Sequence, residues 1–405
     1  MDDAAALVAE RVPPLGGEER VPLAEARGRV LARDLVAGYD LPPFFNSAVD
    51  GYAFAHADLA AAPGGADGTA RLSLSGARAA AGHQPPPLPR GGAMRVLTGA
   101  PMPPGADTVM MQEDARLEGD RAVVLPTGLA RGANARPAGE DVARGAVAVP
   151  KGRRLGPFEV AMAAAQGLPV LRVTPRPRVG VFSTGDEITP VGRPLGPAKT
   201  YDSNRPMLLA MLAALPVEAR DLGPLRDRRG ETAEALAAAA REHDLLVTTG
   251  GVSTGEEDHV RAALEGAGSL VFWRLAVKPG RPAAMGVVGG TPVLGLPGNP
   301  VAAAVTFLHL VRPLALRLAG ASPEPLPRFP AVADFRAKKK AGRREYLRVS
   351  LRREGAALHA TRFPREGAGL LSSLTQSDAF AELPEDVVAV APGDPVAVVP
   401  FAGLV

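Results

Sequence analysis

The sequence contains no cysteine among its 405 residues. This absence excludes disulfides, iron–sulfur clusters, zinc–thiolate sites and a thiol nucleophile. Aromatic residues make up only 4% of the chain, which argues against platforms on which nucleic-acid bases stack. Any soft metal that the protein handles must therefore arrive with its own ligands.

The chain also lacks a strong excess of charge, because 46 basic residues stand against 43 acidic ones and the formal net charge is +3. Binding to a nucleic-acid backbone needs clustered positive charge. Only the run from Lys338 to Arg344 resembles such a cluster. We interpret that run as a solvated or substrate-rim feature, and we expect no nucleic-acid partner.

Signals for export and for membrane insertion are missing as well. Asp2 and Asp3 stand where a secretory signal would carry positive charge, and no apolar segment follows them. The longest apolar stretch, Val301–Leu318, is interrupted by two arginines, a histidine and a proline, which a lipid-spanning helix rarely tolerates. We expect this stretch to be a buried core helix, and the protein to be cytoplasmic with no membrane partner.

A length of 405 residues predicts more than one domain, at about 150 residues each. Segments 1–36 and 138–175 are typical of one mixed linker or dimerisation domain, in which Ala24–Arg33 is predicted to be helical. Residues 37–137, which interrupt it, show short alternating runs that predict an inserted β-rich domain. Residues 176–320 alternate apolar strands with Ala/Leu-rich helices, and 321–405 return to short strands.

The fold class that we expect is thus multidomain α/β plus β. Alternating strands and helices of these lengths are typical of a central, doubly wound, mostly parallel sheet covered on both faces. The inserted β-rich domain precedes this sheet in the chain. A small C-terminal β-barrel follows it.

Three glycine-containing loops follow predicted strands of the α/β domain: Ser183-Thr184-Gly185, Gly250-Gly251-Val252-Ser253 and Pro297-Gly298-Asn299-Pro300. In open α/β sheets, ligands bind beyond the carboxyl ends of the strands, where backbone N–H groups collect anions. Hydroxyl groups and paired glycines suit a phosphate group. No Walker or dinucleotide-binding glycine motif is present, so the phosphate would be held in another way. Each loop by itself is also compatible with a plain tight turn.

Acidic residues cluster near these loops in the sequence. Glu187 ends the first loop, Asp258 follows the second, and Asp227 lies in the turn after the predicted strand 217–222. Three acids at one edge of a sheet are the kind of ligand that Mg²⁺ shares with phosphates. Helix capping is the alternative explanation for them.

Two basic residues face the same region in the predicted strand Val271–Lys278. Arg274 and Lys278 are four residues apart, so a period of two puts both side chains on one side of the strand. Paired cations suit an oxyanion pocket. A pair of surface salt bridges is the alternative.

Eight runs then occur in one collinear order along nearly the whole chain: NSAVDGYA (46–53), LTGAPMPPGADTVMMQE (97–113), RPAGED (136–141), VFSTGDEI (181–188), YDSNRPML (201–208), TTGGVSTGEEDH (248–259), WRLAVKPGRP (273–282) and GLPGNPV (295–301). Together they resemble the molybdopterin molybdotransferases, which complete the molybdenum cofactor. The middle α/β module is also similar to the cofactor-adenylylating family, which shares that domain alone.

The resemblance implies that the α/β domain binds adenylylated molybdopterin through the three loops. The substrate-binding residues implied are Ser183, Thr184, Gly185, Gly250, Gly251, Ser253, Pro297, Gly298, Asn299 and Pro300. The resemblance also implies an elongated homodimer, in which one subunit completes the catalytic site of the other. The catalytic residues implied are Asp50, Thr98, Arg136 and Asp141 from one subunit and Glu187, Asp227 and Asp258 from its partner.

The metal-related residues are likewise implied by the resemblance. Asp227 and Asp258 would hold Mg²⁺, while Arg274, Lys278 and Ser373 would bind molybdate. Arg274 stands where the family usually has a lysine, and guanidinium and ammonium groups bind oxyanions with different geometry.

The implied reaction is an exchange at a phosphoanhydride: molybdate enters, the dithiolene of the pterin takes the metal, and AMP leaves while Mg²⁺ offsets negative charge. It needs no nucleophilic side chain, so catalysis would be mainly positioning and electrostatics. Two alternatives stay open. One is the molybdopterin adenylyltransferase activity, whose enzyme is also an expected partner, and the other is a non-catalytic scaffold of the same architecture.

Overall fold

The computed structural model describes residues 11–62, 68–226, 228–252, 259–266 and 270–403. The chain forms two compact units. The larger unit contains the chain up to Arg33, the segment Lys151–Val160 and everything from Val170 onward. The smaller unit contains Asp34–Pro150 and Ala161–Pro169. The finer division into four domains stays a prediction.

The smaller unit is built on a six-stranded sheet with the order β7-β4-β6-β5-β9-β8. Its strands are β4 (Gly51–Phe54), β5 (Thr69–Ala79), β6 (Gly92–Val96), β7 (Thr108–Met111), β8 (Arg116–Glu118) and β9 (Ala122–Pro126). Alternation along β5 buries Ala70 and Leu72, which pack in a core with Phe54 and Leu125. The helix α2 (His56–Ala61) adds Leu59 to this core. The expected β-rich module is therefore present.

Short strand pairs complete the smaller unit. β2 (Leu35–Val36) pairs with β11 (Val147–Val149), and β3 (Asn46–Ser47) pairs with β10 (Ala135–Arg136). The helix α3 (Pro157–Ala165) carries the chain from the larger unit back into the smaller one.

The larger unit contains the expected α/β sheet, with the strand order β16-β13-β17-β21-β20-β18. Its strands are β13 (Arg178–Thr184), β16 (Glu218–Leu225), β17 (Leu245–Thr249), β18 (Leu270–Trp273), β20 (Ala284–Val288) and β21 (Thr291–Leu296). The neighbouring strands in the series β16-β13-β17-β21 are parallel to one another. β20 is antiparallel to both of its neighbours, β21 and β18. The sheet is therefore mostly parallel, as the sequence predicts.

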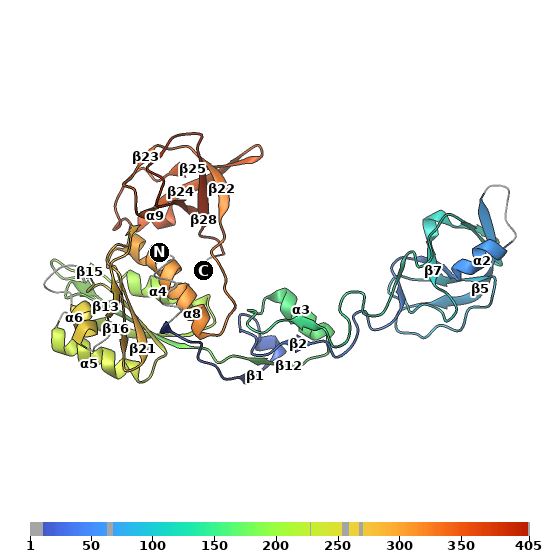
Figure 1. Ribbon diagram of the computed structural model, residues 1–405, viewed down its shortest axis with the longest axis horizontal. Helices are drawn as coiled ribbons and strands as arrows, with labels where there is room; N and C mark the ends of the chain where they lie inside the picture. Colours follow the sequence, from blue (N-terminus) through green and yellow to red (C-terminus); the bar gives the residue numbers. More distant parts are fainter. Residues whose placement is uncertain (1–10, 63–67, 227, 253–258, 267–269, 404–405) are drawn as a thin grey trace. The chain divides into compact units, whose positions relative to one another are not determined.

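Helices cover both faces of this sheet. The helices α5 (Arg229–Ala240) and α6 (His259–Gly266) lie on one face, and α4 (Asn204–Ala213) and α8 (Arg312–Leu318) lie on the other (Figure 1). Side-chain alternation along the strands explains this arrangement, because Leu246 packs in the α5/α6 core while Leu245 and Val247 pack in the opposite core. The doubly wound architecture is confirmed.

The apolar stretch that the sequence places in the core forms a continuous helical segment. It consists of α7 (Pro300–Thr306), the π-helical turn η3 (Phe307–Val311) and α8. By length and composition Pro300–Leu318 is apolar enough to cross a membrane, but 83% of the 18-residue window that meets this criterion is buried in the protein. It contributes Val301, Phe307 and Leu314 to the main core, as expected of a core helix of a folded domain.

The C-terminal strands of the larger unit close into a five-stranded barrel in the order β24-β25-β22-β28-β26, with β26 pairing back to β24. They are β22 (Phe329–Ala333), β24 (Arg344–Glu354), β25 (Ala357–Arg362), β26 (Ala379–Leu383) and β28 (Pro395–Pro400). β19 (Val277–Lys278) adds a short parallel strand to β24. The expected small barrel is confirmed.

Two local predictions are wrong. Ala24–Arg33 is not a helix: a short 3-10 turn, η1 (Leu23–Glu25), is followed by Gly28 at a φ of +79°, and Val30 and Leu31 then form isolated β-bridges. Glycine at positive φ ends regular helix geometry, and the bridges satisfy the backbone instead.

The predicted strand Val271–Lys278 is interrupted. β18 ends at Trp273, Arg274 has a φ of +84°, and Val277–Lys278 belongs to a different sheet. A residue at positive φ leaves the β region of backbone space. The expectation that Arg274 and Lys278 share one side of one strand therefore fails.

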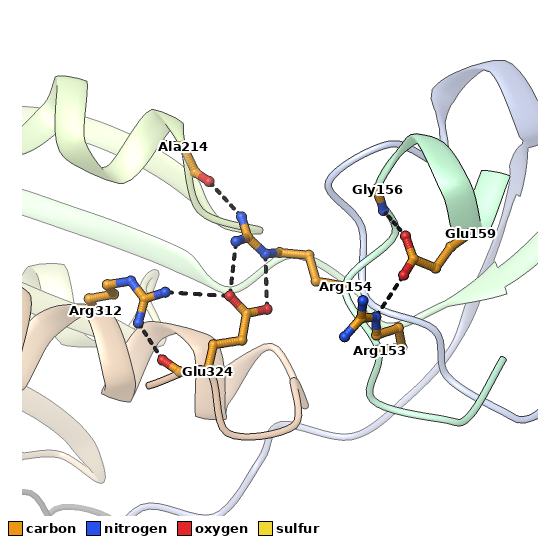
Figure 2. A network of polar contacts seen from close by, with 7 residues as sticks. All are labelled: Arg153, Arg154, Gly156, Glu159, Ala214, Arg312 and Glu324. Atoms are coloured by element: carbon orange, nitrogen blue, oxygen red, sulfur yellow. Dashed lines mark hydrogen bonds and ion pairs between the residues drawn. The ribbon is translucent and has the colours of Figure 1, made fainter. Parts of the chain in front are cut away.

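A polar network at Glu324 joins three segments of the larger unit (Figure 2). The Arg154 guanidinium donates to both carboxylate oxygens of Glu324, at 3.0 and 2.9 Å, and to the Ala214 carbonyl oxygen just after α4, at 3.2 Å. Arg312 on α8 donates to the Glu324 backbone oxygen at 2.7 Å and to its carboxylate at 3.4 Å. One carboxylate thus holds α4, α8 and the segment that precedes α3.

Candidate functional site

A cavity of about 880 Å³ lies at the carboxyl ends of β13, β17 and β21. All three glycine loops line it: residues 183–185 at the end of β13, residues 250–252 after β17, and residues 297–300 after β21. Their convergence at one sheet edge is confirmed. The substrate-binding role of their residues stays a prediction.

The second loop can exist only with glycines. Gly250 and Gly251 have φ angles of +95° and +67°. A Cβ on Gly250 would lie 2.6 Å from Thr184 Oγ1 and 2.7 Å from the Thr184 backbone oxygen, closer than atoms can approach. The absence of side chains therefore lets the second loop pack directly against the first.

The hydroxyl groups of the first loop point at protein partners. Ser183 is 1% exposed, and its Oγ donates to Asp202 Oδ2 at 2.6 Å. Thr184 Oγ1 donates to the Thr249 backbone oxygen at 3.4 Å. These hydroxyl hydrogens are used within the protein. The groups of the loops that can still donate to a bound anion are therefore mainly backbone N–H groups.

The carboxylate of Glu187 lies beside the turn of the first loop. Gly185 has a φ of +136°, and a Cβ there would overlap the Glu187 carboxylate. Glu187 also lines the cavity. It is the member of the predicted acidic cluster that the structure places at the cavity.

Three predicted residues, Ser253, Asp227 and Asp258, lie outside the described residues. Among the residues that are described, no group of three or more His, Asp or Glu side chains forms a metal site by itself. A magnesium ion bound between phosphates keeps several waters and needs only one or two carboxylates from the protein. Glu187 at the cavity fits that requirement.

The N-terminus of α4 supplies residues that sequence reasoning missed. Asp202, Ser203 and Asn204 line the cavity between the loops. Asn204 Nδ2 donates to Thr249 Oγ1 at 2.8 Å and to the Gly298 backbone oxygen at 2.7 Å. The YDSN run marks this position in the sequence, but its partners lie far away in the chain.

A second cavity, of about 550 Å³, adjoins the first and shares Pro282, Pro297 and Asn299 with it. Basic side chains dominate its charged lining: Lys278, Arg281, Lys340, Arg343, Arg348 and Arg362, against Glu345 and Glu366. The basic run near Lys340 thus reaches a cavity, which favours the substrate-rim interpretation. Lys278 Nζ lies 3.3 Å from Glu345 Oε2.

Ser373 contacts Arg348, which lines the second cavity. It is fully buried, donates to the Leu370 backbone oxygen at 2.6 Å and accepts a hydrogen bond from Arg348 Nε at 3.0 Å. Burial lowers the pKa of Arg348 from its ordinary value. No spacing in the sequence links Arg348 to Ser373, so only the fold could reveal it.

Arg274 is exposed, and its backbone N–H donates to the Ala283 oxygen at 3.1 Å. It is not among the described residues that line either cavity. Of the two basic residues, only Lys278 is therefore among the described residues that line the second cavity.

The smaller unit holds its own predicted residues. Asp50 Oδ1 accepts hydrogen bonds from the Thr98 N–H at 2.7 Å and from Thr98 Oγ1 at 2.8 Å. These two hydrogen bonds, the backbone one first, lower the pKa of Asp50 from its ordinary 3.8. Arg136 and Asp141 are exposed. An ionised carboxylate in a fixed orientation suits an electrostatic role.

Comparison with known proteins covers nearly the whole chain. Residues 1–167 match the MoeA N-terminal region (domains I and II), residues 180–317 match a probable molybdopterin binding domain, and residues 330–401 match the MoeA C-terminal region (domain IV). The smaller unit, the α/β sheet and the barrel therefore all have counterparts in one set of families.

Curated relatives agree with these matches. A molybdopterin molybdenumtransferase of Haemophilus influenzae is 36% identical over 99% of this chain and 98% of its own length. A molybdopterin molybdenumtransferase of Synechococcus elongatus is 37% identical over 94% of both chains. The crystal structure of a molybdopterin biosynthesis MoeA protein from Pyrococcus horikoshii has a TM-score of 0.82 and 31% identity, and the match covers 99% of each chain.

Proposed function

The chain belongs to the MoeA family, and from this membership we propose that it is a molybdopterin molybdenumtransferase, a transferase that inserts molybdenum into molybdopterin. We propose further that the pterin enters in its adenylylated form, that molybdate supplies the metal, and that AMP is released.

The observation that carries the proposal is the meeting of three glycine loops around one cavity of about 880 Å³. Small-molecule sites have volumes of about 300–1,000 Å³, so the cavity suits a ligand of nucleotide size. Backbone N–H groups and a helix N-terminus at its floor suit a pyrophosphate. Adenylylated molybdopterin carries such a group at its centre.

The second cavity suits the oxyanion. It adjoins the first and is lined by Lys278 and Arg348, whose charges favour a tetrahedral dianion such as molybdate. We assign Ser373 an indirect role in molybdate binding, because it holds Arg348. For Arg274 we propose a role in molybdate binding only at the rim of this cavity.

Mg²⁺ is proposed as a cofactor that would offset the charge of the phosphates. Glu187 would contribute a carboxylate, and Asp227 and Asp258 are proposed as the further ligands. The other groups of the chain bind and orient the substrates. Loop N–H groups hold the pyrophosphate, and the ionised Asp50, oriented by Thr98, is proposed to position the attacking water or the leaving AMP.

We propose that the working form is a homodimer, in which Asp50, Thr98, Arg136 and Asp141 of one subunit complete the site of the other. Exposed apolar side chains on and just after the β2/β11 pair support an interface. Val36 and Val147, which are opposite each other, are 51% and 52% exposed, and Tyr39, three residues after β2, is 59% exposed.

Mixing two inactive variants tests the homodimer directly. Asp50→Asn and Gly250→Ala chains, mixed and reassembled, would form heterodimers with one intact site. Random assembly would restore about a quarter of wild-type turnover. No recovery despite a mixed dimer would contradict a shared site.

The alternatives are not favoured. The adenylyltransferase family shares the α/β module alone, whereas this chain also matches the MoeA N-terminal and C-terminal regions. A non-catalytic scaffold would not need the closely packed loops around Gly250. We propose a cytoplasmic protein with the molybdopterin adenylyltransferase as a partner, and with neither a nucleic-acid nor a membrane partner.

The test of the proposed function uses purified protein and adenylylated molybdopterin. We expect AMP to appear only when molybdate is added. AMP release that is independent of molybdate would indicate plain hydrolysis, and formation of the adenylylated pterin from ATP would indicate the adenylyltransferase. No release under any condition would support the scaffold.

A further inference from the structure

Asn204 lies at the start of α4, in the wall of the 880 Å³ cavity, and is 7% exposed. Both hydrogens of its amide group are used, one on Thr249 Oγ1 and one on the Gly298 backbone oxygen. Thr249 Oγ1 in turn donates to the Pro297 backbone oxygen at 3.1 Å. Asn204 therefore holds two successive carbonyl groups of the third loop, one directly and one through Thr249.

The positions of these two carbonyl groups determine where the N–H groups of the same peptides point. In a planar trans peptide, the C=O and the following N–H point in opposite directions. The Pro297 and Gly298 carbonyls point at Thr249 and Asn204, so the N–H groups of Gly298 and Asn299 point away from them. Neither N–H donates to any residue in the described part of the chain, and both residues line the cavity.

The amide orientation of Asn204 is fixed by its partners. The Gly298 oxygen can only accept, so the nitrogen of the side chain must face it. Its own Oδ1 is buried and has no hydrogen-bond partner among the described residues. A buried acceptor without a partner is unfavourable, and it calls for an explanation in function. Asn204 thus keeps its two donations although its carbonyl oxygen is left unpaired.

The neighbouring residues fix Asn204 in place. Asp202 Oδ1 accepts from the Arg205 N–H at 3.1 Å, and Asp202 Oδ2 accepts from Arg205 Nε at 2.8 Å and from Ser183 at 2.6 Å. The first turn of α4 is therefore tied to β13. These bonds leave Asn204 little freedom to follow a displaced loop.

We propose that Asn204 is a positioning residue that turns the Gly298 and Asn299 N–H groups toward the phosphate of the substrate. It acts through the carbonyl oxygens on the far side of the same peptides, and it does not itself touch the reacting atoms. The proposal rests on the proposed function, since it assigns the pyrophosphate to this loop. It requires a side chain that donates two hydrogen bonds at position 204.

The substitution Asn204→Asp tests this requirement with almost no change in volume. An ionised carboxylate donates nothing and repels the Gly298 carbonyl oxygen, whereas a protonated one donates once. We expect the variant to bind ADP, used as a probe, at least about tenfold more weakly than the wild type at pH 8. The deficit should shrink as the pH falls and the carboxyl group takes up its proton.

Thr291→Val is the matched control. Thr291 begins β21, the strand that ends at the third loop, and its buried Oγ1 donates to the Ala240 backbone oxygen at 2.8 Å. This variant also loses a buried hydrogen bond to a carbonyl, but at the opposite end of the strand. We expect its ADP affinity to equal that of the wild type, and calorimetry over pH 5.5–8.5 measures all three proteins.

Hydrogen exchange of the wild type provides a second test that needs no variant. We expect ADP to slow exchange of the Gly298 and Asn299 amides. Unchanged exchange at both amides, or equal ADP binding by Asn204→Asp and the wild type at every pH, would overturn the proposal and leave the proposed function standing. A wild-type protein that does not bind ADP at all would overturn both.

Discussion

Thr98 holds Asp50 through two hydrogen bonds to the same carboxylate oxygen, one from its backbone N–H at 2.7 Å and one from its hydroxyl at 2.8 Å. Residues 50 and 98 are far apart in the sequence, and β4 and β6 bring them together as neighbouring strands. The two bonds favour the ionised form and lower the pKa of Asp50. The two bonds therefore favour an oriented, ionised Asp50 carboxylate.

Thr98→Val should raise the pKa of Asp50 toward its ordinary value of 3.8, because it removes the hydroxyl donor and keeps the backbone one. The hydroxyl bond favours the ionised carboxylate, so its loss raises the pKa. A group whose pKa is depressed in the folded protein stabilises the fold above that pKa, and this stabilisation is lost as the pH falls through it. NMR titration of the Asp50 carboxyl group measures the shift. We also expect turnover at neutral pH to fall by roughly tenfold, since the carboxylate loses part of its orientation.

Thr127→Val serves as the control for this variant. Its hydroxyl donates to the Gly68 backbone oxygen at 2.8 Å in the same unit. We expect neither the pKa of Asp50 nor the turnover to change. An unchanged Asp50 pKa in Thr98→Val would show that the hydroxyl bond does not act on the carboxylate in solution.

Gly250→Ala should destabilise the protein and abolish ligand binding, because its Cβ would overlap Thr184. Gly393 has the same φ of +95° with no atom within 4 Å of the Cβ position. Gly393→Ala therefore measures the backbone strain alone, roughly 1–2 kcal/mol. We expect Gly250→Ala to cost about 1–3 kcal/mol more in the free energy of unfolding.

Chemical denaturation measures both glycine variants, and ADP calorimetry measures their binding. Gly393→Ala should bind ADP normally. Equal stability and equal ADP affinity in the two variants would mean that the close approach of the two loops does not exist.

Glu324→Gln should lower the free energy of unfolding, because it leaves Arg154 and the buried Arg312 without their shared anion (Figure 2). Breaking a fully buried ion pair costs about 3–5 kcal/mol. The Glu324 side chain keeps 26% exposure, which weakens the effect through solvent screening. We expect a loss of about 2 kcal/mol.

The exposed pair of Arg220 and Glu218 supplies the comparison. Their side chains are 44% and 52% exposed, so Glu218→Gln should change stability by less than about 0.5 kcal/mol. Urea unfolding of the two variants distinguishes the pairs. A Glu324 variant as stable as the Glu218 variant would assign the network no energetic role.

Ser373→Ala should raise the molybdate concentration needed for half-maximal turnover by roughly tenfold, because Arg348 loses a hydrogen bond that orients its charge. ADP affinity should stay the same, since Ser373 faces the second cavity only through Arg348. The adjacent Ser372→Ala is the control and should behave as the wild type. A normal molybdate requirement in Ser373→Ala would remove Arg348 and Ser373 from the molybdate site.

The mostly parallel α/β sheet and the three loops at its edge could be predicted from the sequence. Three of its strands, β13, β17 and β21, are buried runs that end at the glycine loops. The chain order of strands and helices then places all three loops at one edge. The family resemblance, carried by eight collinear runs, indicated the function.

The features that the sequence did not predict correctly, or did not predict at all, have physical causes. The break at Arg274 depends on one backbone conformation with positive φ that its residue type does not announce. The role of Asn204 depends on partners 45 and 94 residues away. Such side-chain networks are set by tertiary packing, which local patterns do not encode. Position 204 lies inside the YDSNRPML run, but its hydrogen-bond partners are set by the fold.

The most direct test of the account is a single-turnover measurement on adenylylated molybdopterin bound to the protein. The AMP released and the molybdenum retained on the pterin are counted in the same sample after molybdate is added. We predict equal amounts of the two, and no AMP before molybdate arrives. Release of AMP without retained molybdenum would contradict the central claim that one site couples the two events.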